Sequence, residues 1–137
     1  TGPQNYGPHA QLYIKPTGYH GSMIGFPYDD LTTWRGNFYP EDVFENEFKI
    51  LSDTWKQGLE LVENAKDQVP KGKLHNYQDL VSVARTCYCH FRSTYNQIHF
   101  VRQRNVNNID EAKAVAKDEI KLADMLGSPY GGHMLRG

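Results

Sequence analysis

Apolar residues recur at helical spacing through most of this chain. Between residues 40 and 126 they follow one another at intervals of three and four, the spacing of one face of an α-helix. This period predicts helices over about residues 40–67, 75–104 and 109–126. We therefore expect a mainly α fold, in which residues 40–127 form a three-helix up-down-up bundle.

The expected helix boundaries carry residues that start and stop helices. Pro40, followed by two acidic residues, suits the first turn of the first helix. Pro70 and Gly72 interrupt the pattern after that helix. Asn108 suits the cap position of the third helix, and Gly127 suits its end.

The apolar stripes also predict a core. The second helix has the widest stripe, so we expect it at the centre, covered on two sides. Its two cysteines, Cys87 and Cys89, point in different directions, which indicates free thiols and neither a disulfide nor a shared metal site. Gly58, inside the first helix, suits a close approach by a neighbouring helix. The residues expected to be buried are Phe48, Leu51, Trp55, Leu80, Ala84, Phe91, Ile98 and Leu122.

The opening of the chain has a different character. The first 36 residues hold four charged side chains, six glycines, four prolines and five Tyr or Trp, with no helical period. Irregular backbone of this length needs a scaffold to satisfy its polar groups. We therefore expect residues 1–39 to be an irregular, aromatic and Gly/Pro-rich segment that packs on a missing upstream domain. The Gly-rich residues 128–137 are expected to be a flexible tail.

Composition excludes several classes of function. The net charge is −1 and the basic residues are spread along the chain, which argues against a nucleic-acid partner. No apolar run approaches the roughly 20 residues of a membrane span. The six histidines lack zinc spacing, and there is no phosphate loop or nucleophile motif, so we expect no metal, no cofactor and no catalytic residue. Extracytoplasmic and cytoplasmic locations both stay open.

Two clusters in the opening segment could bind a ligand. Gln4 and Asn5 lie between Gly-Pro steps, and their amides suit hydroxyl groups. The alternative for this cluster is a polar turn.

The second cluster comprises Tyr28, Asp29, Asp30, Trp34 and Arg35. Aromatic faces stack on sugar rings, and carboxylates or Arg hold sugar hydroxyls. Alternatively, Trp34 docks the loop on a neighbouring domain, together with Phe26, and one of the two aspartates caps a short turn. Adjacent carboxylates seldom flank a glycosidic bond at the roughly 5–10 Å that hydrolysis needs, so they are not predicted to be a catalytic pair.

These motifs resemble the late part of large bacterial carbohydrate-active enzymes. The nearest architecture is that of the α-glucuronidase-like and hexosaminidase-like glycoside hydrolases, in which a (β/α)₈ barrel precedes a helical C-terminal domain. The resemblance spans residues 1–105. The stretches that carry it are Gly2–Asn5, Lys15–Tyr19, Gly25–Leu31, Trp34–Gly36 and Phe91–Phe100.

The resemblance implies a role in polysaccharide degradation. Gln4 and Asn5 would follow the last barrel strand, near the active-site face, and the Tyr28–Arg35 loop would close over the same face. The catalytic carboxylates would lie upstream of Thr1. The chain is then the C-terminal helical domain, with substrate-facing loops, of a glycoside hydrolase, and its partners are the upstream catalytic barrel and the carbohydrate. The alternative is a non-catalytic helical module that binds a carbohydrate or a partner, or dimerises; a homodimer stays open.

Overall fold

The fold is mainly helical, as the sequence predicts. The structure is a computed structural model that describes residue 8 and residues 12–18, 29–34 and 38–127, none of which lies in a strand. The helices are α1 (Leu31–Trp34), α2 (Glu41–Asn64), α3 (Leu74–Asn105) and α4 (Ile109–Gly127), and two short 3-10 helices, η1 (Lys66–Gln68) and η2 (Lys71–Lys73), join α2 to α3. Among these described helices, none is long and apolar enough to cross a membrane. The expected tail, residues 128–137, lies outside the described residues.

The helix ends follow local chemistry. The carbonyl of Pro40 accepts a hydrogen bond from the amide of Phe44 at 3.0 Å, and this opens α2. At the other end α2 stops three residues before the predicted residue 67, because the chain tightens into η1 ahead of Pro70. Between α3 and α4 the chain turns at Asn107, whose φ of 59° is left-handed. The side chain of Asn108 then accepts the amide of Glu111 at 3.4 Å, in the predicted cap position.

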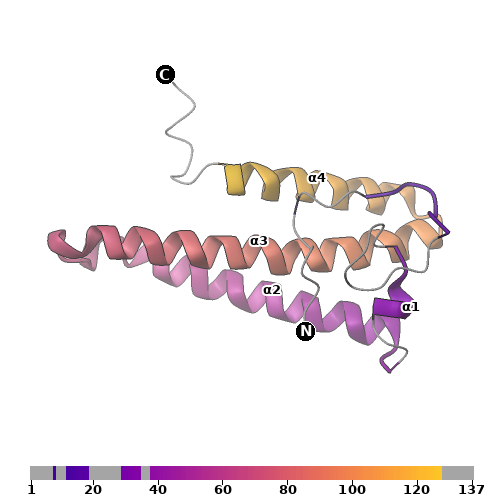
Figure 1. Ribbon diagram of the computed structural model, residues 1–137, viewed down its shortest axis with the longest axis horizontal. Coiled ribbons are helices and arrows are strands. Elements are labelled where there is room, and N and C mark those ends of the chain that lie inside the picture. The colour runs from indigo at the N-terminus through magenta and orange to yellow at the C-terminus, as the bar shows by residue number, and fades with distance from the viewer. Residues whose placement is uncertain (1–7, 9–11, 19–28, 35–37, 128–137) are drawn as a thin grey trace, which may run out of the picture.

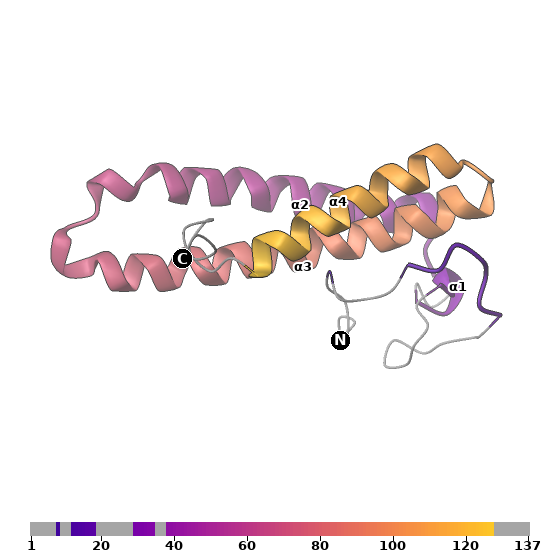
Figure 2. The same ribbon diagram turned by 90° about the horizontal axis from the view of Figure 1, so that it is seen from above.

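Helix α3 is the central element. It packs extensively against α2 and against α4, whereas α2 and α4 make little contact with each other. Figure 1 shows α2 and α4 on different sides of α3, and Figure 2 shows that α4 reaches along only part of its length. The far end of the α2/α3 hairpin therefore extends beyond α4.

Two apolar clusters lie on different sides of α3, near its C-terminal end. One joins Leu31 of α1 to Ile98 and Val101, with Phe44 and Phe48 of α2 packed against it. The other joins Phe100 to Ala112 and Val115 of α4, with Leu12 packed against it. Neighbouring turns of α3 bury a polar layer, namely Ser93, Thr94, Asn96 and Gln97.

The predicted core is correct in part. Ile98 and Leu122 are buried, and Phe48, Ala84 and Phe91 are half-buried. The prediction is wrong for Leu51, Trp55 and Leu80, which keep 38%, 37% and 56% of their surface exposed. The reason is that α4 takes one face of the hairpin, while on the other face the described residue Leu31 covers only the end near α1.

Candidate functional site

The described parts of the opening segment are anchored to α3 by a buried ion pair. The guanidinium of Arg104 lies 3.1 Å from the Asp29 carboxylate, and the two side chains are only 5% and 6% exposed. The same guanidinium donates to the carbonyl of Tyr13 at 2.9 Å. Thr17 donates to Asp29 through its amide, at 2.8 Å, and through its hydroxyl. One Asp–Arg pair thus ties residues 12–18 and residues 29–34 to the same point of α3.

The electrostatics of this anchor favour the charged carboxylate. Burial raises the pKa of Asp29, but the hydrogen bonds from Thr17 and the Arg104 guanidinium outweigh burial and hold the pKa below its usual value. The side chain of Asn105 accepts from the remaining Arg104 nitrogens at 3.2 and 3.0 Å. The arginine is therefore held on several sides, which fixes the position of Asp29.

Apolar contacts also hold residues 12–18 and residues 29–34 against α3. Leu31 is buried against Ile98 and Val101 on one side of α3. Leu12 packs against Phe100 on the other side. Both contacts lie within two turns of Arg104. The two segments therefore lie on different sides of the C-terminal end of α3, next to the ion pair.

Asp29 and Asp30 are the predicted site residues whose side chains the structure describes. Asp29 faces inward to Arg104, while Asp30 caps α1, accepting the Thr33 amide at 3.1 Å and the Thr33 hydroxyl at 2.6 Å. The two neighbours therefore point to different partners and form no joint carboxylate pair. Trp34 is the last residue of α1, and its side chain lies outside the described part of the chain, as do Gln4, Asn5, Tyr28 and Arg35.

A second polar cluster ties the three long helices together next to this anchor. His99 of α3 contacts the Glu45 carboxylate of α2 through Nδ1, and its Nε2 lies 3.0 Å from the Glu111 carboxylate of α4. Arg102 also contacts Glu45, and Tyr95 stacks on the His99 ring at 5.4 Å.

A third cluster lies buried between α3 and α4. Glu119, 6% exposed, accepts from Ser93 and Asn96 at 2.9 Å each. Burial raises the pKa of this carboxyl to about 7, although these two hydrogen bonds oppose the rise. The nearby Arg92 is engaged elsewhere, with Asp118 at 3.1 Å. Glu119 is therefore a buried carboxyl without a cation of its own among the described ion pairs.

These polar clusters do not follow from the sequence pattern. Arg104, His99 and Glu119 are ordinary polar residues of amphipathic helices, and the period treats such positions as solvent-facing. The available signal was that Ser93, Asn96 and Gln97 share one face of the helix with Cys89 and Phe100, so polar residues stand among apolar ones at helical spacing. Tertiary packing decides which residues of α2 and α4 complete the polar clusters of α3.

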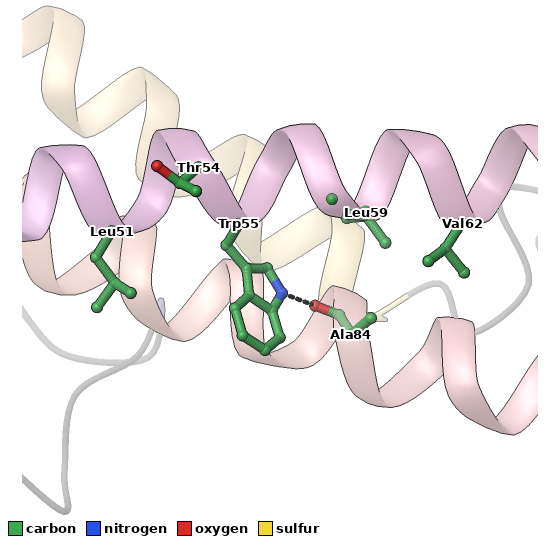
Figure 3. A pocket seen from close by; sticks show the side chains of 7 residues that line it. Leu51, Thr54, Trp55, Leu59, Val62 and Ala84 are labelled. Carbon is green, nitrogen blue, oxygen red and sulfur yellow. Dashed lines mark hydrogen bonds between the residues drawn. The ribbon is translucent and has the colours of Figure 1, made fainter.

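The exposed part of the α2/α3 hairpin contains an apolar groove of about 310 Å³. Figure 3 shows Trp55 extending from α2 toward α3, where its indole N–H donates to the Ala84 carbonyl at 2.8 Å. The indole also meets the Phe91 ring edge to face at 5.2 Å. The lining residues are Leu51, Thr54, Trp55, Gly58, Leu59, Val62 and Ala84. A lining without ionisable groups suits recognition rather than acid–base chemistry.

Cys87 and Cys89 are free thiols, and Cys89 is the buried one. Burial raises the pKa of the Cys89 thiol to about 11, which keeps it protonated and unreactive. Within residues 12–18, 29–34 and 38–127, no group of three or more His, Cys, Asp or Glu side chains is placed to hold a metal ion. Comparison of the chain with protein-family models, with curated proteins and with solved structures gives no match.

Proposed function

We propose that this chain is the C-terminal helical domain, with substrate-facing loops, of a carbohydrate-active enzyme of the glycoside hydrolase type. In this proposal the helices of residues 40–127 form a three-helix bundle that is not catalytic alone. The bundle carries residues 1–39 against an upstream catalytic barrel, and the enzyme acts on a polysaccharide. The carbohydrate part of the proposal comes from the resemblance of residues 1–105 to such enzymes.

The observation that supports a loop-carrying role is the buried Asp29–Arg104 ion pair. It lies where residues 12–18 and 29–34 meet α3, so both ends of the intervening stretch, residues 19–28, start from fixed points. A binding loop gains affinity when its ends are held, because less conformational entropy is lost when it meets its ligand. A buried ion pair is a costly way to hold a surface segment unless the position of that segment matters.

The proposal gives the predicted site residues different roles. Asp29 is a positioning residue, since Thr17 and Arg104 engage its carboxylate. Asp30 holds the start of α1 and stays a candidate for contact with sugar hydroxyls. The other proposed contacts with the carbohydrate are Gln4, Asn5, Tyr28, Trp34 and Arg35.

The test begins with the sequence upstream of Thr1 in the full-length protein. We expect eight βα units with two acidic residues at strand ends. In that protein Trp34→Ala and Asp30→Asn should lower kcat/KM by about 5- to 150-fold, the scale of one lost charge-assisted or buried polar contact. Asparagine caps helices as well as aspartate does, so Asp30→Asn removes the charge and keeps the start of α1.

Two controls make this test decisive. Thr32→Ala changes an exposed residue of α1 and should leave kcat/KM unchanged. Melting temperatures of all variants show whether a loss of activity reflects a loss of fold. An upstream sequence without a barrel would overturn the proposal, as would full kcat/KM in both site variants.

A second candidate function is a non-catalytic helical module that binds a partner or dimerises. The apolar groove around Trp55 favours it, because exposed apolar surface of this kind commonly marks an interaction site. An upstream sequence without a catalytic domain would favour this module over the enzyme domain.

A further inference from the structure

One face of the α2/α3 hairpin is covered at one end and exposed at the other. Near α1 this face is covered, because Leu31 packs on Ile98 and Val101. Toward η1 and η2 the same face becomes the groove, where Leu51 and Trp55 are exposed. The chain itself thus shows that this face accepts an apolar cover.

The groove lies away from α4. Ser93, which contacts α4 through Glu119, follows Ala84 by nine residues, about two and a half helical turns. Ser93 and Ala84 therefore point to opposite sides of α3. Figure 1 agrees, since α2 and α4 lie on different sides of that helix. A longer α4 would consequently not cover the groove.

Gly58 leaves a notch in the α2 wall of the groove. A Cβ at this position would meet nothing within 4 Å, and its φ is not in the left-handed region. Neither strain nor packing inside the chain therefore calls for glycine, which costs about 1 kcal/mol relative to alanine in a helix interior. Ala84 on the α3 wall is also small. The two positions leave room for a side chain from outside the hairpin.

The surroundings of the groove argue against a charged partner or a sugar. The lining holds no charged side chain that could pair with a charged partner, and a sugar would meet Thr54 as the only side-chain hydroxyl of the lining. The indole N–H of Trp55 already donates to Ala84.

The hairpin itself has the properties of a suitable partner. It presents projecting apolar side chains next to the notch; one is Leu80, which lies one turn before Ala84 on α3 and is mostly exposed. A two-fold contact uses the same patch on both copies, so that patch must hold both projections and a recess. The net charge of −1 gives little repulsion between two copies.

We propose that two copies of this chain dock through the groove face of the α2/α3 hairpin. A two-fold axis in the plane of the contact makes the facing helices antiparallel and gives a four-helix arrangement. Apolar side chains of each copy enter the notch at Gly58 of the other. This inference does not rest on the carbohydrate proposal, because it uses the end of the hairpin away from the Asp29–Arg104 anchor.

The size of the face limits the area that the contact can bury. On α2 the groove lining runs from Leu51 to Val62, roughly 18 Å of helix at 1.5 Å per residue. Two helices of that length give an interface near the lower end of specific contacts, at about 1,200 Å² in total. We expect a dissociation constant in the micromolar range.

Sedimentation equilibrium of the 137-residue chain, from about 1 to 200 μM, tests this directly. The wild type should pass from monomer to dimer over this range. Leu80→Lys places a charge on the groove face and should raise the dissociation constant at least 100-fold. Its matched control, Ile120→Lys, changes a similarly exposed apolar residue of α4 and should leave dimerisation unchanged.

Gly58→Leu is the second test variant. Its new side chain meets open space in the monomer, so the fold should persist with an unchanged or higher melting temperature while the dimer is lost. A wild type that stays monomeric at 200 μM would overturn the proposal. Dimerisation that survives both Leu80→Lys and Gly58→Leu would place the interface elsewhere and overturn it equally.

Discussion

Glu119 shows what the polar layer between α3 and α4 contributes. Its carboxyl accepts hydrogen bonds from Ser93 and Asn96, and Gln97 donates to the Ser93 hydroxyl at 3.3 Å. Hydrogen-bonded polar groups in a buried layer are satisfied only when the two helices sit in one register. We infer that this layer fixes how α4 sits along α3, a task that apolar residues of similar volume perform less specifically.

Replacing Glu119 by glutamine should reduce the pH dependence of folding. A carboxyl whose folded pKa rises from 4.5 to about 7 binds its proton more tightly in the folded state. The free energy of unfolding therefore falls as the pH rises through that window, by about 3 kcal/mol in total. Glutamine stays uncharged and can accept from Asn96 and donate to Ser93. Between pH 4.5 and 8, Glu119→Gln should thus lose about 3 kcal/mol less stability than the wild type.

Urea unfolding at both pH values measures this difference. Glu60→Gln, which changes an exposed glutamate of α2, should keep the wild-type dependence. If Glu119→Gln loses as much stability as the wild type over this range, ionisation of the buried carboxyl does not destabilise the fold. The raised pKa of Glu119 is then wrong.

Trp55 contributes to stability differently from a core residue. Over a third of its surface is exposed, so Trp55→Ala should cost less than the roughly 3–5 kcal/mol of a fully buried tryptophan. Trp55→Phe keeps a ring against Phe91 and removes the hydrogen bond to the Ala84 carbonyl, which should cost about 1 kcal/mol. Urea unfolding below 1 μM keeps any dimer out of the measurement. A cost of more than 3 kcal/mol for Trp55→Phe would mean that the indole is buried in solution.

At the scale of the elements, the sequence predicts the helices, but it predicts the contacts between them only in part. The period of three and four gave α2, α3 and α4 because each helix has an apolar stripe, and Pro40, Pro70 and Asn108 marked boundaries close to those observed. Periodicity reports which face of a helix is apolar. It does not report whether another element covers that face.

The errors in the predicted core have this physical origin. Leu51 and Leu80 belong to the stripes, yet α4 packs on the opposite face of α3 and leaves them exposed. Conversely, Asn96 and Gln97 are polar and lie outside the apolar stripe, yet they are buried. For the site, the composition drew attention to Asp29, but its partner Arg104 lies 75 residues away and no local pattern links the two.

The short helix α1 should act as a cover for the core despite its four residues. Leu31→Ala should cost about 2–4 kcal/mol, because it opens a cavity over Ile98 and Val101. Thr32→Ala, on the exposed side of the same helix, should change stability by less than about 0.5 kcal/mol. Urea unfolding distinguishes the two variants. Equal and small effects would mean that α1 does not pack on α3 in solution.

At the scale of the whole molecule, the two ends of the helical part differ in construction. At one end, ion pairs and two apolar clusters hold the opening segment to α3 and join α2, α3 and α4 through His99. At the other end, the α2/α3 hairpin carries a groove that is lined without charged residues and is partly uncovered. This division suits a domain that presents a segment at one end and associates with another chain at the other.

The isolated chain should not hydrolyse glycosides. Hydrolysis needs two carboxyls about 5–10 Å apart on either side of an open cleft. Among the described residues, Asp29 is bound by Arg104, Glu45 contacts His99, and the groove at Trp55 is lined without any carboxylate. We therefore expect no release of phenol from a panel of aryl glycosides above the rate of a buffer blank, at chain concentrations up to about 100 μM. Turnover that disappears in Asp29→Asn or Asp30→Asn would contradict this and would place a catalytic carboxylate in the opening segment. The proposed role in carrying a loop for an upstream barrel would then be wrong as well.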